Sequence, residues 1–191
     1  MARFKTVSEE EVLDAAGEVL GKVGPSGLTL AAVSAAAGLS PATLVQRYGT
    51  REALVRAALL RMWDRLDEAT ARADARHPLT AEGAVGLLVS LSGRYSGASD
   101  DEMAQGLLLL REDFRDPSLR ARGVAWGDAL AKALGRRLSG DPARAEMLGR
   151  LMASQWQGCL IWWGFSREGT LRGYVRRELT DWCVAVLGDE D

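Results

Sequence analysis

Apolar residues recur every three or four positions along most of this chain, which is the spacing of helices that bury one face. Ser8 and Glu11 form a capping box ahead of the first such stretch, which runs to Gly24. The alternation of apolar and polar residues that marks a strand is not seen. The pattern therefore predicts an all-α chain of about nine helices. The apolar positions of the first stretch are Val12, Ala16, Val19, Leu20 and Val23.

The stretch from Leu28 to Leu54 carries the clearest helix punctuation. Thr29 and Ser40 are typical N-caps, and Pro41 suits a first helical position. Gly38 can end the preceding helix in the left-handed conformation at little cost. Gly49 breaks the second helix before a longer one begins near residue 51. Two short helices joined by a glycine turn predict a helix-turn-helix over residues 30–37 and 41–48.

The second of these helices has two distinct faces. Leu44 and Tyr48 fall together on one face, which is suited to packing. The opposite face carries short side chains, an amide and a guanidinium, which can read base edges in a major groove. The same pattern also fits an ordinary helical hairpin, so it leaves both interpretations open. The outward residues are Ala42, Thr43, Gln46 and, at the edge, Arg47.

Residues Val12–Leu54 resemble the N-terminal DNA-binding domain of TetR-family transcriptional regulators, through VLDAAGEVL, Gly24, TLAAVSAAAGLS and PATLVQRYGTREAL. The resemblance implies a DNA-binding domain over residues 1–54 and a helical effector-binding and dimerisation domain over 55–191. Val45 departs from the family pattern, which usually has a phosphate-contacting aromatic residue there. Arg51 stands where the family usually has a phosphate-binding lysine.

These observations define the predicted DNA contacts. Arg3 and Lys5 form a basic arm before the first helix, although a disordered tail would look the same. Residues 1–55 contain five basic and six acidic residues, so the domain offers little positive charge and modest neutralisation of phosphates. The predicted DNA-binding residues are Arg3, Lys5, Thr29, Ser40, Ala42, Thr43, Gln46, Arg47, Tyr48, Thr50 and Arg51.

The remaining chemistry is sparse. Cys159 and Cys183 lie in apolar surroundings without CxxC spacing, which favours buried thiols in a reducing cytoplasm over a disulfide or a metal site. His77 is the single histidine and has no partner cluster, so no metal, no cofactor and no enzymatic activity is predicted. The N-terminal residues do not resemble a signal peptide, and no membrane span is expected. We therefore predict a cytoplasmic protein.

The last two predicted helices are unusually apolar around their circumference. A surface helix needs an apolar stripe of about 100°, whereas apolar residues cover nearly half of the helix Leu171–Leu187. The stretch Ala143–Phe165 is similarly broad. Both helices are either entirely interior or shared with a second copy of the chain, and two-fold symmetry favours a homodimer. The predicted interface residues are Leu171, Val175, Leu179 and Trp182.

Tryptophans are concentrated in the C-terminal part, where they can line a cavity for a flat or hydrophobic effector. An aromatic stripe at helical spacing is also typical of an ordinary core, and that alternative stays open. The predicted effector-binding residues are Met103, Trp126, Met152, Gln155, Trp156 and Cys159.

Together these features predict a homodimeric regulator that binds a palindromic operator in double-stranded DNA and is released from it, as a repressor, by a small molecule. The main alternative is a helical small-molecule-binding or adaptor protein that has lost DNA recognition, which Val45 and the thin positive charge favour. An enzyme is a more distant third.

Overall fold

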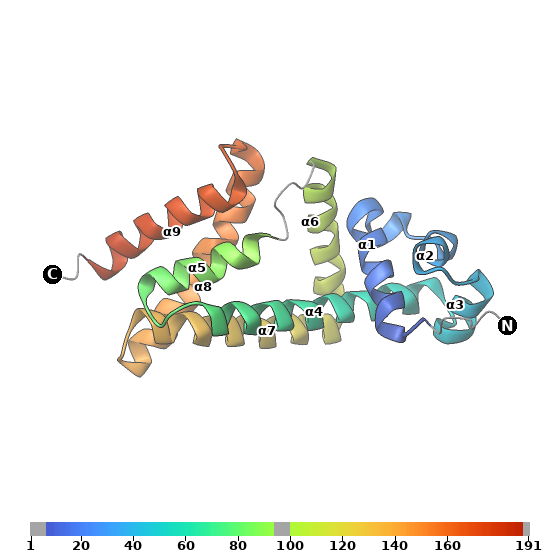
Figure 1. Ribbon diagram of the computed structural model, residues 1–191, viewed down its shortest axis with the longest axis horizontal. Coiled ribbons are helices and arrows are strands. Elements are labelled where there is room, and N and C mark those ends of the chain that lie inside the picture. Colours follow the sequence, from blue (N-terminus) through green and yellow to red (C-terminus); the bar gives the residue numbers. More distant parts are fainter. Residues whose placement is uncertain (1–6, 94–99, 189–191) are drawn as a thin grey trace. The chain divides into compact units, whose positions relative to one another are not determined.

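The computed structural model describes residues 7–93 and 100–188, with the backbone alone for 100–105. The described residues form nine α-helices and no strand, which confirms the predicted fold class (Figure 1). No helix in this part of the chain is long and apolar enough to cross a membrane. The helices are α1 (Glu9–Gly27), α2 (Leu30–Ala37), α3 (Pro41–Tyr48), α4 (Arg51–Arg76), α5 (Ala81–Ser92), α6 (Asp100–Arg115), α7 (Pro117–Leu138), α8 (Pro142–Ser166) and α9 (Leu171–Leu187).

The predicted capping box starts α1. The Ser8 hydroxyl accepts a hydrogen bond from the Glu11 amide at 3.1 Å, and the Glu11 carboxylate accepts one from the Ser8 amide at 2.8 Å. The helix continues past its expected end at Gly24 and finishes at Gly27. Gly24 has a φ of 69°, so the chain bends there and Pro25 begins a further turn in a new direction.

The chain divides into two compact units. The first unit comprises the described residues as far as Arg65 together with α6 and the beginning of α7 as far as Gly123, and the second unit comprises the remainder. The sequence-based division after residue 54 places α6 and α7 in the C-terminal domain. In the structure α6 packs against α1, and Leu119 of α7 joins the N-terminal core, so these segments complete the first unit.

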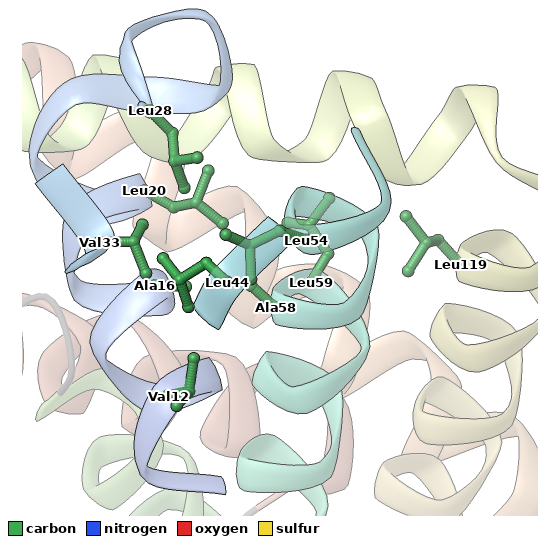
Figure 2. Packing of buried hydrophobic residues seen from close by; sticks show 10 residues of the cluster. All are labelled: Val12, Ala16, Leu20, Leu28, Val33, Leu44, Leu54, Ala58, Leu59 and Leu119. Atoms are coloured by element: carbon green, nitrogen blue, oxygen red, sulfur yellow. The ribbon is translucent and has the colours of Figure 1, made fainter. Parts of the chain in front are cut away.

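One hydrophobic cluster holds the first unit together (Figure 2). The side chains come from α1, the α1–α2 junction, α2, α3, α4 and α7, so residues far apart in sequence fix how the helix-turn-helix is held. Each is at least 96% buried, which makes burial of apolar surface the main stabilising contribution. The cluster contains Val12, Ala16, Leu20, Leu28, Val33, Leu44, Leu54, Ala58, Leu59 and Leu119.

In the second unit, α9 packs against both α5 and α8. Helices α7 and α8 come into backbone contact through Gly135 and Gly149. A Cβ atom at Gly135 would collide with the Ala145 carbonyl, and one at Gly149 would collide with the Ala131 carbonyl. Glycine at these positions therefore permits an approach that no other residue allows.

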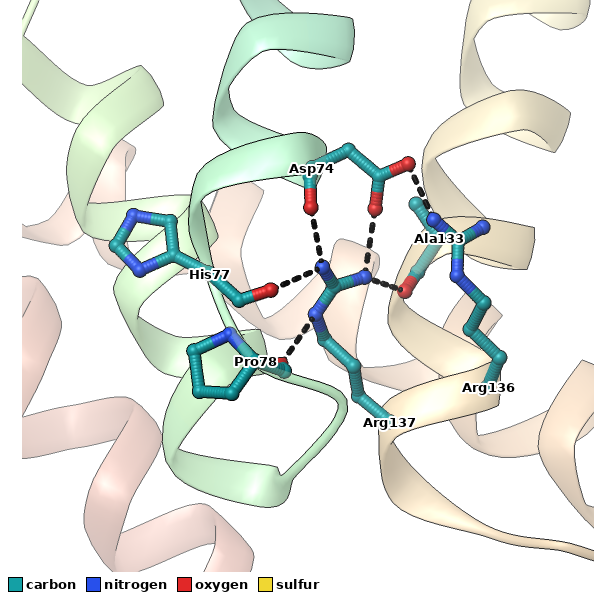
Figure 3. A network of polar contacts seen from close by, with 6 residues as sticks. All are labelled: Asp74, His77, Pro78, Ala133, Arg136 and Arg137. Atoms are coloured by element: carbon teal, nitrogen blue, oxygen red, sulfur yellow. Dashed lines mark hydrogen bonds and ion pairs between the residues drawn. The ribbon is translucent and has the colours of Figure 1, made fainter.

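A buried arginine completes the end of α4 (Figure 3). The Arg137 side chain is fully buried and donates hydrogen bonds to the carbonyls of Asp74, His77 and Pro78 at 2.7, 2.9 and 3.0 Å. It also donates to the Asp74 carboxylate at 2.7 Å. Burial alone would raise the pKa of Asp74, but hydrogen bonds from Arg137 and Arg136 outweigh it and lower that pKa below its ordinary value. The carbonyl of Asp74 in the last turn of α4 and the two carbonyls that follow the helix are thus satisfied by a side chain from α7.

Candidate nucleic-acid interface

The outward face of α3 has the character expected from the sequence. Leu44 is completely buried in the core, whereas Ala42, Gln46 and Arg47 are exposed and Thr43 is half-buried. The turn before it is closed by Gly38 in the left-handed conformation and by the Ser34 hydroxyl, which donates to the Leu39 carbonyl at 2.6 Å. The two helices are therefore held firmly while the polar face of α3 is left to solvent.

The three predicted cap residues occupy the helix starts. The hydroxyls of Thr29, Ser40 and Thr50 accept hydrogen bonds from the amides of Ala32, Thr43 and Ala53 at 3.1, 3.2 and 3.1 Å respectively. All three residues are exposed. Each hydroxyl can accept at the helix end and still donate its proton elsewhere, for example to a phosphate oxygen.

Arg47 links the recognition helix to the segment that precedes α1. Its two terminal nitrogens each donate to the Val7 carbonyl at 3.2 Å, and the residue is exposed. Because water can replace such a contact, the guanidinium can exchange it for a base edge without a large penalty. Arg3 and Lys5 of the predicted basic arm lie outside the described residues.

The hydrogen-bond partners of Arg51 differ from those expected for a residue that binds a phosphate. Its Nε donates to the Leu28 carbonyl at 2.8 Å, and Nη2 donates to the Pro25 carbonyl. Nη1 pairs with the Glu52 carboxylate at 3.3 Å. All three nitrogens of the guanidinium are therefore engaged within the first unit, and no signal in the sequence anticipates these partners.

The Tyr48 side chain belongs more to the hydrophobic core of the first unit than to the outward face of α3. Its ring packs against the hydrophobic cluster, and its hydroxyl oxygen is buried with no hydrogen-bond partner in the described structure. Burial raises the pKa of this phenol, and the negative charge of Glu9 adds to the effect. The predicted DNA contact through Tyr48 does not match this placement, because its polar atom is withdrawn from the outward face.

An open cleft of about 710 Å³ lies beside the start of α4, within the first unit. Pro25, Val55, Leu59 and Leu119 contribute apolar lining, and three arginines and three carboxylates also line it. One of these pairs, Arg56 and Asp116, is joined at 2.8 Å. The balanced charges give the cleft no preference for an anion, so nothing in its chemistry marks it as part of a DNA-binding surface.

The predicted effector residues lie mostly in the core of the second unit. Trp126, Met152, Trp156 and Cys159 are each at least 92% buried. The rings of Trp126 and Trp156 are tilted by 53° with their centroids 6.3 Å apart. Gln155, in contrast, is exposed, and the side chain of Met103 lies outside the described residues. The predicted set is thus brought together in part, as a packed aromatic cluster.

Both indole nitrogens of this cluster are satisfied from neighbouring helices. Trp126 donates to the Thr70 hydroxyl at 3.0 Å, and Trp156 donates to the Ser92 hydroxyl at 2.8 Å. Burial raises the pKa of the Cys159 thiol to about 11, so this thiol stays protonated and unreactive at neutral pH. Within the described residues, no group of three His, Cys, Asp or Glu side chains is positioned to hold a metal ion.

The predicted dimer residues are placed inside the protomer. Leu171, Val175 and Leu179 are at least 98% buried within it, and Trp182 is half-buried. They pack where α9 meets its neighbours, so they have little surface left to offer a second copy. The exposed apolar residues of α8 and α9 are different ones: Met147, Leu151, Ile161, Trp162, Phe165, Val184 and Val186.

A family model named "Bacterial regulatory proteins, tetR family" matches residues 12–58, the segment that contains the helix-turn-helix. Many solved structures share the whole fold, including regulators of this family. This N-terminal segment belongs to the TetR family. A comparison with curated protein sequences gives no match.

Three solved structures illustrate the likeness of the whole chain to known folds. A transcriptional regulator from a Rhodococcus species has a TM-score of 0.73 at 17% identity, with 94% of this chain and 96% of that chain covered. A TetR-family regulator from Streptomyces coelicolor has 0.67 at 18%, covering 96% and 86%. The multidrug binding protein EbrR, solved with malachite green, has 0.63 at 23%, covering 90% and 95%. At these identities the likeness establishes the fold.

Proposed function

We propose that this TetR-family protein binds a palindromic operator as a homodimer and acts as a repressor that a small hydrophobic molecule releases. The observation that carries the proposal is the division of α3 into a buried Leu44 and an exposed Ala42, Gln46 and Arg47. A short, firmly anchored helix with small and hydrogen-bonding side chains outward has the shape and the chemistry for a major groove.

Each outward group has a natural partner on a base pair. The Gln46 amide can pair with adenine, the Arg47 guanidinium can pair with guanine, and Ala42 can pack on a thymine methyl group. Val45 is 47% exposed on the same helix and adds apolar surface where the family usually has an aromatic phosphate contact. Binding therefore depends more on base contacts than on charge.

The exposed apolar residues of α8 and α9 suit a dimer interface. On α8, Leu151, Gly158, Trp162 and Phe165 follow one another at helical spacing, with Leu151, Trp162 and Phe165 49%, 65% and 79% exposed. Val184 on the adjacent helix α9 is 54% exposed. Exposed apolar residues of this kind suit an interface, and a two-fold dimer would present two recognition helices to the two halves of a palindrome.

The cluster of Trp126, Met152 and Trp156 is the proposed effector site. The multidrug binding protein EbrR was solved with malachite green. In this chain a flat apolar molecule would have to enter between closely packed side chains, so binding must move the helices that carry them. An effector that binds the moved state better than the packed one shifts the population away from the DNA-competent form.

Selection of bound fragments from a random double-stranded DNA library tests the proposal. We expect a palindromic site whose half-sites are spaced by about one helical turn. Arg47→Ala should weaken binding by about 1–3 kcal/mol and lose discrimination at one base pair. Lys22→Ala, which removes an exposed charge on α1, is the matched control. Failure to enrich any sequence would favour the alternative, a small-molecule-binding or adaptor protein that has lost DNA recognition.

A further inference from the structure

The C-terminal end of α1 lacks the positive charge that a helix end favours. Its last turn contains no basic residue, and carbonyls at a helix end have no partner within the helix. The chain bends at Gly24, and Leu28, which has an extended backbone, separates α1 from α2. The carbonyls of Pro25 and Leu28 must therefore find donors elsewhere or remain with water.

Arg51 supplies these donors from the first residue of α4. Nε and Nη2 are adjacent nitrogens on a rigid planar fork, and they reach the carbonyls of Leu28 and Pro25, which lie 23 and 26 residues earlier in the chain. A lysine carries the same charge but presents a single nitrogen, so it cannot hold two carbonyls in this fixed geometry.

The position of Arg51 gives this clamp a consequence for recognition. Leu28 immediately precedes Thr29, the N-cap of α2, while Arg51 immediately follows the Gly49–Thr50 junction that ends α3. The clamp therefore joins the chain where the helix-turn-helix begins to the chain where it ends. A fixed distance between these two points sets the orientation of α3 relative to α1 and α2.

We propose that Arg51 is a positioning residue that sets the orientation of the recognition helix, and that it is not a phosphate contact. The inference rests on the proposed DNA-binding function. Glu52 strengthens it, because its carboxylate occupies the remaining terminal nitrogen at 3.3 Å and would repel an approaching phosphate. The Arg51 side chain is 35% exposed and the Glu52 side chain 76%, so the carboxylate is the group nearer to solvent.

The test compares Arg51→Lys and Arg51→Gln with the parent protein on the selected operator. If Arg51 is a positioning residue, both variants lose about tenfold or more in affinity, which corresponds to the loss of one charge-assisted hydrogen bond, and both keep the parent's dependence on salt. If Arg51 contacts a phosphate, lysine restores the affinity and glutamine lowers the salt slope by about one unit. That second result would overturn the inference.

Two further measurements distinguish a failure of this inference about Arg51 from a failure of the proposed DNA-binding function. Hydrogen exchange at the amides of residues 28–34 should speed up in Arg51→Lys and stay unchanged in Lys22→Gln. If the parent selects no DNA, the proposed function fails, and exchange alone decides whether the clamp exists. If affinity is unchanged at a temperature where every variant is folded while the melting temperature falls, Arg51 merely stabilises the fold, and the positioning role is refuted.

Discussion

The two units carry their candidate residues in opposite surroundings. In the first unit Ala42, Gln46 and Arg47 face solvent, and their chemistry is available to a partner without any rearrangement. In the second unit Trp126 and Trp156 are packed against each other, with both indole N–H groups already bonded. The proposed DNA-reading face is therefore preformed, whereas the proposed effector site would have to be opened, and opening it would cost packing energy. A ligand that binds only the opened state of such a site would shift the population of the protein toward that state.

Removing the buried guanidinium of Arg137 should have the largest effect on stability. Arg137→Met removes one of the two arginine donors of the Asp74 carboxylate and leaves the carbonyls of Asp74, His77 and Pro78 without this donor, and we expect a loss of about 3–5 kcal/mol in unfolding free energy. Arg136→Met, which removes a half-exposed partner of Asp74, should cost less than about 1 kcal/mol. Urea unfolding measures both. Equal losses in the two variants would show that the second unit does not depend on this buried donor.

Substitutions of two valines on α9 should separate effects on folding from effects on dimer assembly. Val175 is fully buried and Val184 is 54% exposed. Val175→Asp must bury a carboxylate within the protomer and should destabilise it by about 3 kcal/mol or more. Val184→Asp should leave the protomer folded and weaken the proposed dimer, which sedimentation detects. If Val175→Asp instead gave a folded monomer, the dimer interface would contain the residues first predicted from the sequence.

Lowering the pH should destabilise the second unit through Asp74 and stabilise the first unit through Asp113. Burial would raise the pKa of Asp74, but Arg137 and Arg136 outweigh it and lower that pKa below its ordinary 3.8. The ionised Asp74 carboxylate therefore contributes its full stabilisation above pH 3.8. This stabilisation is lost as the pH falls through the lowered pKa. The pKa of Asp113 is raised, chiefly by burial and despite the hydrogen bond from Trp63. Its carboxylate therefore opposes folding increasingly as the pH rises above 3.8.

The corresponding amides make this measurable. Relative to the parent protein, Asp74→Asn should be least destabilised at low pH, whereas Asp113→Asn should become relatively more stable as the pH rises. Urea unfolding at several pH values compares the two variants, and the side-chain amide introduced by Asp113→Asn can still accept the hydrogen bond from Trp63. Parallel pH profiles for both variants would contradict the assigned causes of the shifts.

Restoring an aromatic residue on α3 should have the smallest effect. Val45→Tyr places a phenol on an exposed position of the recognition helix and should strengthen binding to all sequences by about 1 kcal/mol, roughly fivefold. Val23→Tyr, at a 46% exposed position on α1, is the matched control. A gain confined to one sequence would mean that position 45 faces a base and not the backbone.

Local signals made the first unit predictable. Thr29, Ser40 and Gly38 act within a few residues of their own positions, so their roles follow from sequence spacing alone. The partners of Arg51 and the addition of Leu119 to the N-terminal core involve residues far apart in the chain. No periodic pattern contains that information, because periodicity describes one helix and not the helices around it.

For the apolar faces of α8 and α9 as well, the sequence pattern does not show which residues the surrounding helices bury. A helical wheel shows which residues share a face but not which face meets the protomer's own core. Leu171, Val175 and Leu179, spaced by four residues, turn inward, while Val184 and Val186 remain exposed. On α8, Trp163 is buried and its neighbour Trp162 is 65% exposed, so the apolar arc alone could not tell which of the two faces the chain's own core.

The glycine contact between α7 and α8 has a mechanical consequence. At Gly135 and Gly149 the two backbones touch, so at this end there are no intervening side chains to compress or rearrange. Farther along the same pair, Trp126 and Trp156 hold the helices apart with large rings. If the two helices spread, the close contact at the glycines favours a rotation about that point, with an amplitude that grows with distance from it. The proposed effector, held between the tryptophans, would act far from that point, where a given force produces the largest torque.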